Sequence, residues 1–275
     1  MVKGQWQILS AKVRGALHIR QGKPCQDAIC YHHFMADSIV CAIADGHGSS
    51  QCPYSEDGAR LATECAVKLV EDMAYYNDLN SIYTLLEQVG SVTLPQQIEL
   101  KWKESVMCFH NMQKRPWPDD KDKEANGLYK LYGTTLLLLV VTPIFLYAAQ
   151  IGDGDILCID EKGGVQYVLE PTQTYGVETH SLCERKAWRA FKTMCMPITD
   201  DFKGKLFLLS TDGYANSFVS TEDFMQAGRD YLSLLEKHDS ETIEKMLPIW
   251  LEEASSIGSG DDMTLALISR RGEAQ

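Results

Sequence analysis

The spacing of apolar residues divides the chain into helical and extended stretches. In the helical stretches, apolar side chains recur every three or four positions, which is the period of a helix that buries one face. Helices are predicted on this basis over residues 55–73, from about 81 or 95 to 106, over 221–236 and over 241–255. The helices therefore come in two pairs, one in each half of the chain.

Short apolar runs bounded by glycine, proline or polar residues predict strands instead. These runs lie at residues 6–17, 38–44, 133–141, 144–150, 155–159, 165–169, 207–210 and 263–268. Polar loops are predicted at 22–27 and 115–124, and a hairpin turn at 161–164. The apolar run 136–149 contains Thr142-Pro143 in its middle, so it predicts two buried strands joined by a turn rather than a membrane span.

The order of these elements indicates the class of fold. Strands are followed by two helices, several strands, two helices and a final strand. Helices in pairs argue against a doubly wound parallel sheet, in which helices alternate with strands. We therefore expect an α+β fold, a central β-sandwich of two antiparallel sheets flanked by helix pairs, formed by a single domain over residues 1–275.

Composition and charge exclude several classes of function. A hydrophobic content of 45% and a charged content of 23% are typical of a folded globular protein. The net charge of -12 disfavours nucleic acid and anionic membranes as partners. Nine cysteines without a Cys-x-x-Cys pair indicate reduced thiols, and the first seven residues lack the pattern of a secretory signal. We therefore expect a cytoplasmic protein.

Aspartates recur at the ends of the apolar strands, each beside a glycine: Asp45, Asp153, Asp212 and Asp261. Carboxylates that converge repel one another unless a cation neutralises them, and a site with only oxygen ligands favours Mg²⁺ or Mn²⁺. His47 follows the first of them closely and is a candidate acid near neutral pH. Four ordinary Asp-Gly turns are the alternative explanation of the same residues.

Six short motifs occur in the order found in one enzyme family. They are Cys25-Gln26-Asp27-Ala28, Ala44-Asp45-Gly46-His47-Gly48, Gly133-Thr134-Thr135, Ile151-Gly152-Asp153, Ser210-Thr211-Asp212-Gly213 and Gly260-Asp261-Asp262-Met263-Thr264. Together they resemble the metal-dependent type 2C Ser/Thr protein phosphatases, the PPM family, and most of all its compact bacterial members. The resemblance implies two central antiparallel sheets with helix pairs outside, and a centre of two Mn²⁺ or Mg²⁺ ions at one end.

The resemblance also assigns roles to residues of this chain. Asp45 would bridge the two ions, the Gly46 carbonyl would add a ligand, and Asp212 and Asp261 would complete the set. Asp27 would act largely through metal-bound water. Asp153 and Asp212 match the position that holds a third, weaker ion in some members, and His47 matches the proposed general acid.

The function implied is hydrolysis of phosphoserine and phosphothreonine by direct attack of a hydroxide that bridges the two ions. Phosphorylated proteins would be the partners, with a cognate Ser/Thr kinase or its substrates among them, and a monomer is expected. The alternative is a pseudophosphatase that binds phosphoproteins or a kinase without turnover. A metal-dependent nuclease would share the cation chemistry, but the composition lacks the basic character of such enzymes.

The chain departs from the family pattern at three places. Gln26-Asp27 stands where Glu-Asp is frequent, which removes one carboxylate near the metals. Gly22 occupies the position of a phosphate-binding arginine. Arg20 is the candidate for the substrate phosphate, and the alternatives are Lys23 or neither residue.

The third departure is Asp261-Asp262, where Asp-Asn is common; position makes Asp261 the ligand. Residues 185–192 are basic with interleaved aromatics, which is typical of a solvated helix face. In this family the same region carries a variable flap beside the active site.

Overall fold

Two antiparallel five-stranded sheets form the centre of the computed structural model, which describes residues 6–118, 127–171 and 179–270. The first sheet has the order β1 (Trp6–Val13), β10 (Met263–Arg270), β9 (Gly204–Ser210), β6 (Asp155–Asp160) and β7 (Val165–Tyr167). The second has the order β2 (Asp27–Phe34), β3 (Ser38–Asp45), β4 (Leu136–Val141), β5 (Phe145–Ile151) and β8 (Lys192–Pro197). The expected pair of antiparallel sheets is confirmed.

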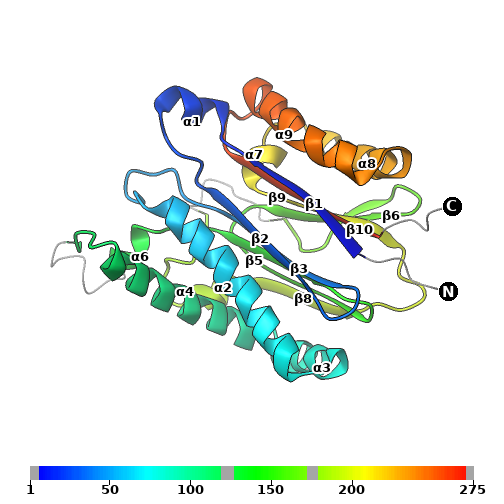
Figure 1. Ribbon diagram of the computed structural model, residues 1–275, viewed down its shortest axis with the longest axis horizontal. Coiled ribbons are helices and arrows are strands. Elements are labelled where there is room, and N and C mark those ends of the chain that lie inside the picture. Colours follow the sequence, from blue (N-terminus) through cyan, green and yellow to red (C-terminus); the bar gives the residue numbers. More distant parts are fainter. Residues whose placement is uncertain (1–5, 119–126, 172–178, 271–275) are drawn as a thin grey trace.

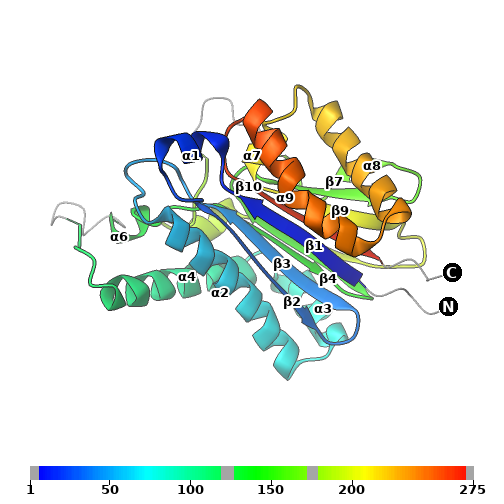
Figure 2. The same ribbon diagram turned by 45° about the horizontal axis from the view of Figure 1, so that its top comes forward.

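Helices cover the outer face of each sheet (Figure 1). The second sheet is covered by α2 (Ser55–Tyr76), α3 (Leu79–Val89) and α4 (Thr93–Met112). The first sheet is covered by α8 (Thr221–Lys237) and α9 (Ser240–Ile257), as the turned view in Figure 2 also shows. The shorter helices are α1 (Ala16–Gln21), α6 (Gly127–Lys130), α7 (Asp212–Ala215) and the 3-10 turn η1 (Ala187–Ala190). The layers therefore run helix, sheet, sheet, helix.

The unbroken apolar sequence of β3 and β4 is explained by burial on both faces. Ile43 and Leu137 point between the sheets, where they meet Phe207 of β9 and its neighbours. Ala42 and Leu138, one residue along each strand, point the other way into the core beneath α2. Since successive side chains of a strand alternate between faces, a strand covered on both sides has no polar positions.

Several predicted boundaries were wrong for local reasons. The helix predicted from residue 81 or 95 is two helices, α3 and α4, with Gly90 at the end of the first. The loop assigned to residues 22–27 is preceded by α1, which is too short to show a helical period. No strand was assigned to β2, whose central residues are largely exposed and polar.

The basic stretch 185–192 is not a helix face. It contains only η1, and Lys192 already begins β8, an edge strand whose residues are half-buried on both faces and so show no alternation. Of the predicted loop 115–124, the part from 119 on lies outside the described residues. In the part of the chain that is described, no helix combines the length and apolar character needed to cross a membrane.

Gly58 sits where α2 presses on the segment that leads into the Gly-Thr-Thr motif. A Cβ there would lie 1.9 Å from the Tyr132 carbonyl oxygen. We expect Gly58→Ala to destabilise the protein by about 1–3 kcal/mol, because backbone must move to admit the methyl group. Urea unfolding followed by circular dichroism measures this change.

Gly228→Ala is the matched control, since Gly228 also lies inside a helix. Its Cβ would meet only side chains, Ile159 at 3.3 Å and Leu157 at 3.9 Å. We expect this variant to be neutral or up to about 1 kcal/mol more stable, because alanine favours helix over glycine. Equal midpoints for the two variants would contradict the packing argument.

Candidate active site

Asp45 is held at the end of β3 by the Gly-Thr-Thr motif. The Asp45 N–H donates to Thr135 Oγ1 at 2.9 Å. The Asp45 carbonyl accepts from the Thr135 N–H and from the Thr134 hydroxyl, both at 2.9 Å. The N–H and the carbonyl of Asp45 are thereby both hydrogen-bonded, which fixes the backbone and leaves the carboxylate available to contact a ligand.

The two residues after Asp45 are fixed by close packing. The Gly46 N–H donates to the Gln26 carbonyl at 3.1 Å, and a Cβ on Gly46 would lie 2.6 Å from the Ser55 carbonyl oxygen. The His47 N–H donates to the Gly133 carbonyl at 3.0 Å. A Cβ on Gly133 would lie 2.7 Å from Cδ2 of His47, so the imidazole rests directly on this glycine.

Asp27 and Asp212 bring two further carboxylates from other strands. Asp27 pairs with Asp45 in the β2–β3 register, is 1% exposed, and accepts from the Thr211 hydroxyl at 2.8 Å. Asp212 begins α7 directly after β9, and its Oδ2 accepts from the Asn216 amide at 3.1 Å. Oδ1 of each of these two carboxylates is buried and receives no donor from the described residues.

The carboxylates perturb one another strongly. Burial raises the pKa of Asp45 well above its ordinary range, and the charges of Asp27 and Asp212 raise it further. Burial raises the pKa of Asp27 to about 8, against the opposing hydrogen bond from Thr211. The pKa of Asp212 is also raised, first by burial. Buried oxygens without donors, in a set that repels itself, fit a hard divalent cation such as Mn²⁺ or Mg²⁺.

Asp261 reaches the same cluster from the loop before β10. Its charge raises the pKa of both Asp45 and Asp212, and its side chain is 50% exposed. The loop packs against α7, because a Cβ on Gly213 would lie 2.1 Å from the Asp262 carbonyl oxygen. Gly213 is thus the residue that lets the loop approach Asp212.

Asp153 lies at the edge of the cluster, next to an acid that sequence reasoning missed. Asp153 Oδ2 accepts from the Thr179 hydroxyl at 2.7 Å, and Asp153 raises the pKa of Asp212. Asp155 lines the same hollow of about 390 Å³ as Asp153 and Asp212. Burial, then the charges of these two residues, raises the pKa of Asp155 to about 7. The sequence Gly-Asp-Gly-Asp at residues 152–155, which leads into β6, is the signal from which Asp155 could have been predicted.

The two basic candidates differ in their surroundings. Arg20 is exposed in the last turn of α1. Lys23 Nζ lies 3.4 Å from the Gly48 carbonyl oxygen, beside His47. His18, on α1, is a further residue that sequence reasoning missed, because its partners lie at the other end of the chain.

Comparisons with known proteins identify the family and the fold. Residues 14–252 match the model of the family described as Protein phosphatase 2C, and no curated protein matches the chain. Among solved structures, a bacterial serine phosphatase is 13% identical with a TM-score of 0.60, covering 99% of this chain and 100% of its own. Serine/threonine phosphatase Stp1 from Staphylococcus aureus is 15% identical with a TM-score of 0.61, covering 99% and 98%.

The catalytic domain of serine threonine protein phosphatase PstP, in complex with two manganese ions, is also similar. It is 13% identical with a TM-score of 0.58, covering 96% of this chain and 97% of its own. At these identities the structures establish a shared fold, and the family model establishes membership. The chain belongs to the protein phosphatase 2C family, a family of serine/threonine phosphatases.

Proposed function

We propose that this protein hydrolyses phosphoserine and phosphothreonine in proteins with the help of two Mn²⁺ or Mg²⁺ ions, and that residues 1–275 form one catalytic domain. The observation that carries the proposal is the convergence of Asp27, Asp45, Asp212 and Asp261, whose mutual repulsion raises the pKa of Asp45. The complex of PstP with two manganese ions supports the number of ions and the choice of metal.

Each carboxylate has a distinct part in holding the ions. We assign Asp45 to both ions, with the Gly46 carbonyl, Asp212 and Asp261 as further ligands. We assign Asp27 to metal-bound water, as the family resemblance implies, with its Oδ2 held by the Thr211 hydroxyl. When bound, the ions supply a hydroxide nucleophile at neutral pH and neutralise charge on the phosphoryl oxygens.

Asp153 and its surroundings are assigned to a third, weaker ion together with Asp212. Their charges interact, since Asp153 raises the pKa of Asp212. One oxygen of Asp153 is occupied by the Thr179 hydroxyl, which leaves the other for a cation. A site with so few fixed ligands holds its ion loosely.

His47 is assigned as the general acid. Its backbone is fixed by the Gly133 carbonyl, and its own carbonyl accepts from the Gln26 amide at 3.3 Å, while Gly133 packs against the ring. A proton held on its ring nitrogen goes to the departing seryl or threonyl oxygen, a contribution of about 10²–10⁴ in rate. Lys23, by its contact with the Gly48 carbonyl, is better placed than Arg20 to attract the phosphoryl group.

The substrates we expect are proteins phosphorylated by a cognate Ser/Thr kinase, acted on in the cytoplasm by a monomeric enzyme. The test is phosphate release from a panel of phosphoserine and phosphothreonine peptides. We expect release with Mn²⁺, a fall to background with EDTA, and recovery when Mn²⁺ is added back, because the carboxylates alone provide no nucleophile.

Calorimetric titration with Mn²⁺ separates the two candidate functions. A protein that binds Mn²⁺ but releases phosphate from no peptide would be the pseudophosphatase, and the complete carboxylate set argues against that result. A protein that neither binds Mn²⁺ nor turns over would contradict the metal centre itself.

A further inference from the structure

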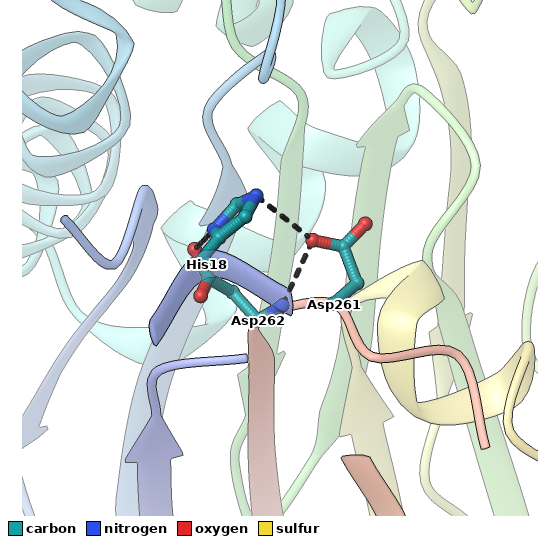
Figure 3. A group of neighbouring side chains, drawn as sticks. All are labelled: His18, Asp261 and Asp262. Atoms are coloured by element: carbon teal, nitrogen blue, oxygen red, sulfur yellow. Dashed lines mark hydrogen bonds and ion pairs between the residues drawn. The ribbon is translucent and has the colours of Figure 1, made fainter. Parts of the chain in front are cut away.

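His18 joins the carboxylate cluster from α1, and no sequence motif pointed to it. The residue is 8% exposed. Its Nε2 lies 3.6 Å from Asp261 Oδ1, and its Nδ1 lies 2.9 Å from Asp262 Oδ2 (Figure 3). The imidazole therefore stands between two consecutive carboxylates, with one ring nitrogen toward each.

Asp262 has a structural role that fixes the orientation of this ring. Its Oδ1 accepts from the Gly15 N–H at 2.7 Å and its Oδ2 from the Gln26 N–H at 2.6 Å, and the side chain is 3% exposed. The contact of Oδ2 with His18 Nδ1 is short but lacks the alignment of a hydrogen bond. This short contact holds the ring so that its other nitrogen, Nε2, is directed at Asp261 Oδ1.

A second observation points to a cation beside Nε2. An idealised Cβ on Gly48 would lie 3.5 Å from Gln26 Oε1 and 4.0 Å from His18 Nε2. Both atoms thus face the small space that Gly48 leaves open. Gln26 is 9% exposed, and its Oε1 is buried and receives no donor from the described part of the chain. Acceptor atoms that gather without a donor match the needs of a positive ion.

We propose that His18 Nε2 is a nitrogen ligand of the divalent cation that Asp261 holds, with Asp262 as the carboxylate that orients the ring. Ligand atoms about 2.0–2.2 Å from one ion lie at most about 4.4 Å apart, and 3.6 Å satisfies this limit. A metal-bound histidine whose other nitrogen faces a carboxylate is a common arrangement. The proposal rests on the metal centre of the proposed function and replaces the oxygen-only ligand set expected from sequence.

A ring nitrogen alters which metal the site prefers. Imidazole suits first-row transition metals, whereas Mg²⁺ is bound by oxygen ligands. His18 therefore raises the affinity for Mn²⁺ relative to Mg²⁺. We expect His18→Asn to lower Mn²⁺ affinity by about 10–100-fold and Mg²⁺ affinity by much less, as calorimetric titration would show.

Pulsed electron paramagnetic resonance of the Mn²⁺-loaded protein tests ligation directly. We expect nitrogen coupling to Mn²⁺ in the wild type, and loss of this coupling in His18→Asn. His47→Asn is the matched control and keeps the coupling. Labelling wild-type histidine with ¹⁵N changes the isotope pattern without any substitution, so the test survives a variant that fails to fold.

Two outcomes overturn the proposal: wild-type protein that binds Mn²⁺ without histidine nitrogen coupling, or coupling that persists in His18→Asn. Lower activity in His18→Asn with unchanged coupling would assign the residue to positioning and would also overturn it. Nitrogen coupling in a protein that hydrolyses no phosphopeptide would sustain the proposal while the proposed function fails.

Discussion

Asp45→Asn is expected to lose at least about 10³-fold in phosphatase activity and yet to be more stable than the wild type in EDTA. The activity falls because Asp45, in the proposed function, is the ligand shared by both ions, and such a ligand supplies several kcal/mol of transition-state stabilisation. The stability rises because Asp45 is half-buried among carboxylates that repel it, and an amide removes that repulsion. Each kcal/mol gained raises the melting temperature by about 2–4 °C.

The pH dependence of stability in EDTA tests whether repulsion between the carboxylates is the cause of the stability gain. The pKa of Asp27 is raised to about 8 in the folded state, against about 3.9 when unfolded. A raised pKa contributes stability that is present below pH 4 and is lost as the pH rises through 8. We therefore expect metal-free wild type to lose stability over this window, Asp45→Asn to lose less, and saturating Mn²⁺ to stabilise only the wild type. Identical slopes for the two metal-free proteins would refute the repulsion.

His47→Asn is expected to slow hydrolysis of a phosphoserine peptide by about 10²–10⁴ while Mn²⁺ affinity is unchanged. The leaving group distinguishes proton transfer from positioning. Nitrophenolate leaves without a proton, so p-nitrophenyl phosphate should lose much less activity than the peptide. Gly133→Ala should reproduce part of the peptide defect, because its Cβ would lie 2.7 Å from Cδ2 of His47. Equal losses on both substrates would show that His47 only positions other groups.

The parts of the fold that sequence predicted well are those with a single environment along their length. The strand at 38–44 and the helix that begins at Ser55 are examples: one is buried on both faces and the other on one face. Strands β2 and β8 escaped notice because their residues are partly exposed without alternation. In such strands the pairing comes from neighbours distant in sequence rather than from a local pattern.

The residues of the candidate site likewise fall into those that sequence predicted and those that it missed. Asp45 and Asp212 were identifiable because a strand end, a carboxylate and a glycine occur together in sequence. His18 carries no such local sign, because its partners Asp261 and Asp262 lie at the far end of the sequence. A site residue can be predicted from sequence when its neighbours lie in the same short segment. A residue whose partners lie in distant segments cannot.

The pairing of β1 with β10 has a consequence for biosynthesis. Trp6 lies opposite Arg270, and the Asp262 carboxylate holds the Gly15 N–H, so the first and last described strands are neighbours. Only Asp262 lies between Asp261 and β10. Since translation proceeds from the amino terminus, Asp27, Asp45 and Asp212 are synthesised before Asp261. The four carboxylates can therefore come together only after Asp261 has been translated.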